Sequence, residues 1–151
     1  MRVTAKVDYA VRAMIELAAV DEGPVKLDQL KNAQAIPPKF LGHILTDLRR
    51  AGLVFSQRGA EGGYRLAREP GEITVADIIR AVEGPLANVQ GVRPDEVNYQ
   101  GLAQPLREVW VATRGALRSV LENVTLSDLI AGQLPISVKK LLEEPDAWAP
   151  R

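Results

Sequence analysis

Near residue 52 the spacing of apolar residues changes from that of a helix face to that of a strand, and this change restricts the fold more than any other feature. Before it, apolar side chains repeat at the spacing of one helix face, at Leu41, Ile44, Leu45 and Leu48. After it, residues 53–56 and 64–67 are predicted as short strands on either side of a glycine-rich turn at 58–63. That pattern is typical of a β-hairpin.

Two more helices are predicted before this one. The first has an apolar stripe at Val7, Ala10, Val11, Met14, Ile15 and Ala18 and ends before the turn cluster at 21–24. A short helix is predicted over Leu27–Ala33, although Lys26 is a poor N-cap. The third helix begins at Pro37-Pro38 and ends at Gly52, where a left-handed cap is expected. Three helices followed by a hairpin are the order of a winged helix-turn-helix, so the expected fold is mainly α with a small β-hairpin wing.

The rest of the chain is predicted to form an appendage to this domain. Thr74 opens a fourth helix, with Asp77 completing a capping box, and Gly84-Pro85 ends it. Residues 86–101 have no clear period and are expected to form a loop. A loop of this length is often functional. We therefore expect a DNA-binding domain at 1–84, a connecting loop at 85–101, helices at 102–143 and a fraying tail at 144–151.

A long helix is predicted from Leu102 to Asn123, and it supports dimerisation. Such a helix extends about 30 Å, more than this small chain can easily cover. Its apolar seam runs through Leu106, Val109, Trp110, Thr113, Leu117, Val120, Leu121 and Val124. We expect a long dimerisation helix that packs against its copy in a symmetric homodimer. The alternative is a core helix covered by its own chain.

The composition excludes several classes of function. The chain has no cysteine, so disulfides, thiolate metal sites and cysteine nucleophiles are excluded. Its apolar runs are far shorter than the roughly 20 residues that span a bilayer, and its N-terminus lacks a hydrophobic signal core. The single histidine, His43, has no triad partner near it in sequence, and residues 59–63 lack the Lys-Ser/Thr of a phosphate loop. We expect a cytoplasmic protein that is not an enzyme and needs no cofactor, metal or membrane.

The charge is distributed unevenly, although the net charge is zero. Residues 1–70 carry 11 Lys and Arg against 8 Asp and Glu, a net charge of +3, and residues 71–151 carry 8 against 11, a net charge of −3. A local basic patch is what a phosphate-binding face requires, although a solvated surface would look the same. The residues expected to bind DNA are Lys39, Phe40, His43, Arg49, Arg50, Arg58, Gly59 and Tyr64.

Each of these residue types suits a particular part of the duplex. The start of the third helix, with Lys39 and His43, is placed to reach base edges in the major groove. Phe40 could pack on a thymine methyl group, and core packing is the alternative. Arg58 suits a narrow minor groove, whereas Arg49 and Arg50 are expected to touch phosphates.

Four segments resemble one known family. They are residues 8–14 (DYAVRAM), 40–54 (FLGHILTDLRRAGLV), 58–66 (RGAEGGYRL) and 73–84 (ITVADIIRAVEG). Together they resemble the Rrf-type winged-helix regulators, the group of IscR, NsrR and CymR. The resemblance implies a homodimer that crosses at the long helix and reads a palindromic operator in double-stranded DNA.

The chain departs from that family in the loop before the long helix. Many members hold an iron–sulfur cluster there with three cysteines, and thiolates are the usual cluster ligands. Residues 86–101 contain neither cysteine nor histidine, so we predict a cluster-free member. Arg93, Asn98, Tyr99 and Trp110 are instead candidates for a small-molecule effector pocket. Ordinary loop packing is the alternative.

A competing function is a winged-helix protein–protein adaptor that does not bind DNA. The zero net charge favours it, and Lys39 and Arg58 at the positions expected to face DNA oppose it. The two functions predict different salt dependence, because phosphate contacts make affinity fall steeply with salt.

Overall fold

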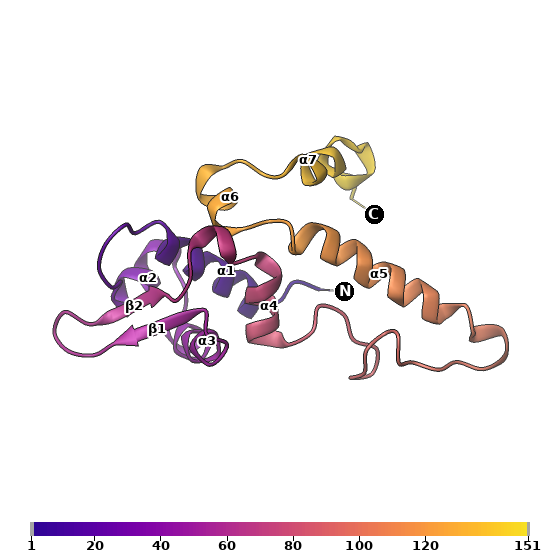
Figure 1. The fold of residues 1–151 in the computed structure, drawn as a ribbon, viewed down its shortest axis with the longest axis horizontal. Coiled ribbons are helices and arrows are strands. Elements are labelled where there is room, and N and C mark those ends of the chain that lie inside the picture. The colour runs from indigo at the N-terminus through magenta and orange to yellow at the C-terminus, as the bar shows by residue number, and fades with distance from the viewer. Residues whose placement is uncertain (1, 151) are drawn as a thin grey trace.

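The structure, a computed structural model, describes residues 2–150 and consists of a winged-helix body from which one helix extends (Figure 1). The helices are α1 (Ala5–Ala18), α2 (Leu27–Gln34), α3 (Pro38–Arg50), α4 (Val75–Glu83), α5 (Leu106–Leu121), α6 (Leu126–Ala131) and α7 (Ile136–Glu143). The strands are β1 (Val54–Gln57) and β2 (Gly63–Leu66). Single 3-10 turns lie at Pro70–Glu72, Gly101–Ala103 and Pro145–Ala147. Residue 151 of the predicted tail lies outside the described residues.

The core is built around α1, which contacts α2, α3, α4, α6 and β2. Its buried face consists of Val7, Ala10, Ala13, Met14 and Leu17. The stripe predicted from sequence was therefore partly wrong, because Val11, Ile15 and Ala18 are only partly buried. Helices surround α1 on more than one side, so small Ala13 is buried where a single-faced stripe would leave it exposed.

Helix α3 forms as predicted, with Leu41, Ile44, Leu45 and Leu48 buried. Its end is a left-handed cap, in which Gly52 has φ +71° and its N–H donates to Arg49 O at 3.0 Å. The Leu53 N–H donates to Leu48 O at 3.0 Å, which completes the pair of bonds typical of a glycine C-cap. This cap turns the chain directly into β1.

The hairpin pairs β1 and β2 antiparallel, with Val54 opposite Leu66 and Gln57 opposite Gly63. A third segment joins this sheet, because Tyr64 and Val25 exchange backbone hydrogen bonds of 2.8 and 2.9 Å. A Cβ on Gly63 would lie 2.5 Å from the Val25 carbonyl oxygen, so only glycine permits this close approach. The wing is thereby fixed to the segment that begins α2.

Two capping boxes join α4 and α6 to the same core. The Thr74 hydroxyl accepts from Asp77 N–H in α4, as predicted, and Thr125 and Asp128 repeat the arrangement in α6. The two N-cap residues form a bridge, and Leu126 N–H donates to Ile73 O at 3.0 Å. Leu126 is fully buried, so α6, which was expected to belong to the 102–143 segment, packs within the winged-helix body.

Helix α5 is shorter than predicted, because it spans 16 residues instead of the range Leu102 to Asn123. Leu102 is fully exposed in a 3-10 turn, and Pro105 has no N–H to continue a helix through it. At the other end Val124 leaves the helix and is buried, where its carbonyl accepts from Val75 N–H at 2.9 Å. Figure 1 shows the 85–105 loop running out from α4 and α5 returning to the body. No helix within residues 2–150 has the length and apolar character to cross a bilayer.

The turn between α2 and α3 contains Ala35 in the left-handed region, at φ +51°. We expect Ala35→Gly to raise the free energy of unfolding by about 1 kcal/mol, because glycine removes the steric cost of this conformation. Urea unfolding followed by circular dichroism measures the change. The matched control is Ala33→Gly within α2, which should lower stability by about 1 kcal/mol. A destabilised Ala35→Gly variant would contradict this account.

Candidate nucleic-acid interface

The face of α3 opposite its buried stripe is open to solvent. Lys39, His43, Arg49 and Arg50 are all exposed along it. The Lys39 ammonium lies 5.9 Å from the centroid of the Phe40 ring, which holds the cation beside the start of the helix. The structure therefore brings these four predicted side chains to one surface.

Two of the predicted DNA-binding residues are half-buried. Phe40 packs edge-on against Tyr9 of α1, with ring centroids 5.3 Å apart, and Tyr64 packs against the core from β2. Core packing, the alternative considered for Phe40 from sequence, is thus its main contact in the structure.

The single acid of α3, Asp47, is neutralised within the fold. Its carboxylate accepts from the Lys6 ammonium at 2.8 Å, and the Arg50 guanidinium lies 3.9 Å away. Lys6 also donates to the Val82 carbonyl at 2.7 Å, so one ammonium joins α3 to the last turn of α4. Pairing Asp47 in this way reduces its repulsion of an approaching phosphate.

The orientation of α3 is fixed from α1 across the helix-turn-helix. Arg12 donates to the backbone carbonyl and the side chain of Gln34, and the Gln34 amide donates to Glu16. Arg12 also lies over the Tyr9 ring at 5.3 Å. Because Gln34 ends α2 immediately before the turn, these contacts hold the turn that sets the angle of α3.

A hollow of about 520 Å³ lies between the start of α2, the end of α3 and the wing. Three cations line it, Lys26, Arg49 and Arg58, and among the residues that the structure describes no acid does. Gly59 lies at its rim on the exposed wing turn. The hollow thus joins predicted residues from two separate elements into one basic surface, which we call the wing hollow.

Lys26 was missed as a candidate by the sequence analysis. It occupies the N-cap of α2 without a side-chain capping bond, and the Gln29 side chain instead accepts from its backbone N–H at 2.8 Å. A cation at a helix N-terminus opposes the helix dipole. That unfavourable choice was the signal that could have identified Lys26.

The loop before α5 is held to that helix by one carboxylate. Asp95 accepts from Arg114 at 2.5 Å and from Arg93 at 2.8 Å, and its backbone carbonyl accepts from Arg107 at 2.8 Å. The Arg114 hydrogen bond is the main reason that the pKa of Asp95 falls from 3.8 to about 2. The Arg93 guanidinium is therefore paired with Asp95.

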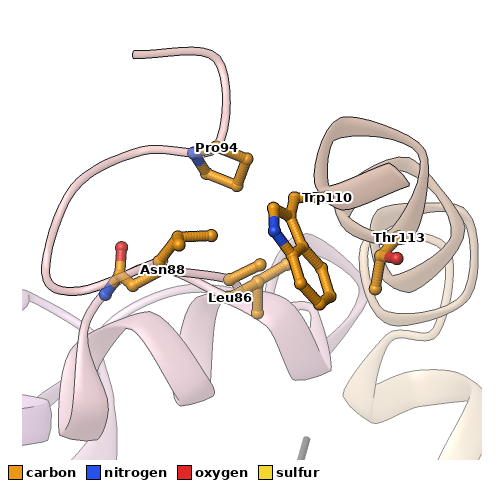
Figure 2. Close-up of a pocket in the computed structure, with 7 residues that line it drawn as sticks. Leu86, Asn88, Pro94, Trp110 and Thr113 are labelled. Carbon is orange, nitrogen blue, oxygen red and sulfur yellow. The ribbon is translucent and has the colours of Figure 1, made fainter. Parts of the chain in front are cut away.

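The predicted effector pocket is only partly assembled. The Trp110 indole N–H donates to the Tyr99 hydroxyl at 3.1 Å, so these two predicted side chains are in contact. The cavity beside Trp110, about 230 Å³, is instead lined by Leu86, Ala87, Asn88, Val89, Pro94, Trp110 and Thr113 (Figure 2). Arg93, Asn98 and Tyr99 lie outside its lining.

The predicted dimer seam divides into three groups. Leu106 and Val109 are exposed, Val109 at 52%. Trp110, Thr113, Leu117, Val120 and Leu121 are half-buried against their own chain. Val124 lies beyond α5 and is buried, so its place in the seam was wrong. The open part of α5 is thus narrower than the sequence indicated.

A helix-turn-helix whose second helix is open to solvent, followed by a basic hairpin, is the architecture of winged-helix DNA-binding domains, and this chain has it. The sequence model of the Rrf2 family, described as iron-dependent transcriptional regulators, matches residues 3–132. The chain therefore belongs to the Rrf2 family, which confirms the resemblance found in its motifs. It is a DNA-binding regulator and not an enzyme.

Relatives with related names support this assignment. A protein of Mycobacterium tuberculosis named as an HTH-type transcriptional regulator, Rv1287, is 49% identical over 145 residues, which cover 95% of this chain and 90% of that protein. CymR of Bacillus subtilis is 39% identical over 130 residues, covering 85% and 89% of the two chains.

Solved structures agree with the fold. The structure of CymR, the global cysteine regulator of B. subtilis, matches with a TM-score of 0.74 and 38% identity, covering 88% of this chain and 98% of that one. IscR of T. potens matches with a TM-score of 0.69 and 33% identity, covering 100% and 93%. Both confirm the mainly helical winged-helix fold.

The family description raises the question of whether this chain could hold iron. Iron–sulfur clusters are bound by thiolates, and the sequence contains no cysteine. The single histidine, His43, lies on the exposed face of α3, and the described residues contain no group of three His, Cys, Asp or Glu suited to a metal ion. The residues present therefore do not fit an iron–sulfur cluster.

The Asp95 contacts predict a measurable titration. We expect Arg114→Ala to raise the pKa of Asp95 from about 2 toward 3.8, because the guanidinium that stabilises the carboxylate is removed. Since the folded pKa is depressed, the stabilisation is present above pH 3.8 and is lost as the pH falls through about 2. Carboxyl-carbon NMR titration measures the pKa, and Arg118→Ala, one turn along α5, is the control. An Asp95 pKa unchanged by Arg114→Ala would contradict the assignment.

Proposed function

We propose that this protein is a sequence-specific transcriptional regulator that binds a palindromic operator as a homodimer without an iron–sulfur cluster. The wing hollow is the observation that carries the proposal, because its cations continue the exposed face of α3. Such a regulator acts in the cytoplasm, where bacterial DNA lies.

In the proposed complex, α3 enters the major groove. Lys39 and His43, near its N-terminal end, contact base edges, as the corresponding part of such helices does. Lys26, Arg49 and Arg58 surround a strand at the wing hollow and bind phosphates, which position the protein on DNA. This proposal departs from the sequence-based contacts in two ways: Lys26 is added, and Arg58, which was expected in the minor groove, is assigned to a phosphate because it lines the wing hollow with Lys26 and Arg49.

The proposed homodimer forms through α5. Leu106 and Val109 are exposed by 36% and 52%, although they lie on a well-formed helix. An open groove of about 360 Å³ also separates α5 from α1 and α4, lined by Val3, Val7, Ile79, Leu117 and Leu121 among others. A partner α5 would cover both surfaces, and two-fold symmetry would give two recognition helices and hence a palindromic site.

Operator selection from random duplexes, followed by anisotropy titration across salt concentration, tests DNA binding. We expect Arg58→Ala and Lys26→Ala each to reduce the slope of log affinity against log salt by about 1 to 2 per dimer, because each removes phosphate contacts. Lys39→Ala should cost about 1–3 kcal/mol and relax specificity at one base pair per half-site.

Lys140→Ala, on exposed α7, is the control and should leave both quantities unchanged. If no sequence is enriched, and weak DNA binding is unchanged by Arg58→Ala and Lys26→Ala, the proposal is rejected and a protein–protein adaptor is favoured.

Sedimentation analysis of Val109→Glu tests the dimer. We expect the dimer dissociation constant to rise by about 100-fold or more, because two carboxylates would be buried at a symmetric interface. Val20→Glu is a matched control, since Val20 is 43% exposed but lies between α1 and α2. A dimer unaffected by Val109→Glu would place the interface elsewhere.

A further inference from the structure

The cavity beside Trp110 is formed by the loop after α4 and the middle of α5. In Figure 2, Trp110 extends from α5 toward the loop, with Pro94 on one side and Leu86 on another. Of the residues in the described chain that line the cavity, four are aliphatic or proline, one is the indole, and Asn88 and Thr113 supply the polar groups. None of these lining residues carries a charge.

The indole is held in place before anything binds. Its N–H donates to Tyr99 at 3.1 Å, and the loop itself is fastened to α5 by Asp95 and Arg114 at 2.5 Å. Pro94, next to that carboxylate, is buried against the cavity. A wall fixed by polar bonds outside the cavity can keep an apolar face open, which lowers the ordering cost of binding.

The size of the cavity limits its ligand. An apolar cavity of about 150 Å³ accommodates benzene, and this one measures about 230 Å³. A single aromatic ring with one substituent therefore fits, whereas a nucleotide or a fused cofactor does not.

The polar groups restrict the ligand further. The Thr113 hydroxyl donates to Val109 O at 2.8 Å, so it remains available as an acceptor, and the exposed Asn88 amide offers both donors and an acceptor. The nearby charges of Arg93, Asp95 and Arg114 already pair with one another. A charged ligand would lose hydration here without gaining a partner.

We propose that the Trp110 cavity binds an uncharged, single-ring aromatic molecule that carries one hydrogen-bond-donating substituent. The ring lies on the Trp110 indole, and the substituent bonds to Thr113 and Asn88. This site differs from the one expected from sequence, because Asn98 and Arg93 take no part in it.

The cavity is also connected to α3, an inference that rests on the proposed DNA-binding function. Leu86 and Ala87 follow α4 after one short turn, and the last turn of α4 contains Val82. The Lys6 ammonium bonds both the Val82 carbonyl, at 2.7 Å, and Asp47 of α3, at 2.8 Å. A ligand that shifts the 86–89 segment therefore acts on the helix that reads DNA.

Trp110 fluorescence measures binding directly, without DNA. Trp148, 71% exposed, is replaced in a Trp148→Phe background so that Trp110 is the sole indole. Benzamide is the probe, and we expect a saturable change in emission with a dissociation constant of about 1 mM, as suits a ligand of nine heavy atoms. Benzoate, of the same shape but charged, should bind at least tenfold more weakly.

Matched variants locate the site. Ala87→Leu, which fills the cavity, and Asn88→Ala should each weaken benzamide binding, and Asn98→Ala in the same loop should not. Thermal unfolding verifies that each variant folds. If Ala87→Leu does not fold, the comparison of Asn88→Ala with Asn98→Ala decides the outcome. The absence of a saturable change, equal binding of benzoate, or loss on Asn98→Ala with Asn88→Ala unaffected would overturn the proposal.

Operator titration with and without saturating benzamide tests the connection to DNA. We expect the operator dissociation constant to change at least fivefold, the lower end of typical coupling between two sites. An unchanged constant with benzamide bound would overturn the connection. If the protein binds its operator but Trp110 fluorescence does not respond to benzamide, the ligand site is rejected and the DNA-binding function stands. If Trp110 responds but no operator is bound, only the DNA-binding function is rejected.

Discussion

The burial of one side of α3 is the constraint on which the rest of the structure depends. Leu41, Ile44, Leu45 and Leu48 are at most 1% exposed, and each contributes about 1.5–3 kcal/mol by leaving water. Neighbouring residues on a helix are separated by about 100°, so a rotation by one position would bury Arg49 in one direction or His43 in the other. The same packing that stabilises the domain therefore also exposes the face of α3 that we propose reads DNA.

Features determined by neighbouring residues could be predicted from the sequence. The capping box at Thr74, the left-handed cap at Gly52 and the hairpin over residues 53–67 all formed close to where they were expected. Each depends on hydrogen bonds or backbone angles within a few residues, so the local pattern contains the required information. The exposed cations of α3 and the wing followed, because their positions are fixed by those elements.

Features that depend on distant contacts were predicted less well. The limits of α5 depend on where Val124 docks against Val75, and no periodicity within α5 contains that information. The lining of the cavity depends on the path of the 86–94 segment. That path places Leu86 and Pro94 beside Trp110, whereas Asn98 lies outside the lining. Lys26 was judged only as a capping residue, and its place beside Arg58 results from the Val25–Tyr64 bridge.

Helix geometry also explains how α5 can both line the Trp110 cavity and present a second face to a partner helix. Trp110, Leu117 and Leu121 are spaced for one face, which turns toward the loop and α4, whereas Val109 precedes Trp110 by one residue and lies about 100° away. The face available to a partner helix therefore adjoins the face that lines the Trp110 cavity. The far end of α5 is in turn joined to α4 by the ion pair of Glu122 and Arg80. In the proposed dimer, a ligand in the cavity would therefore act through one helix on both α4 and the partner α5, which is how the proposed ligand site and the proposed dimer interface would be coupled.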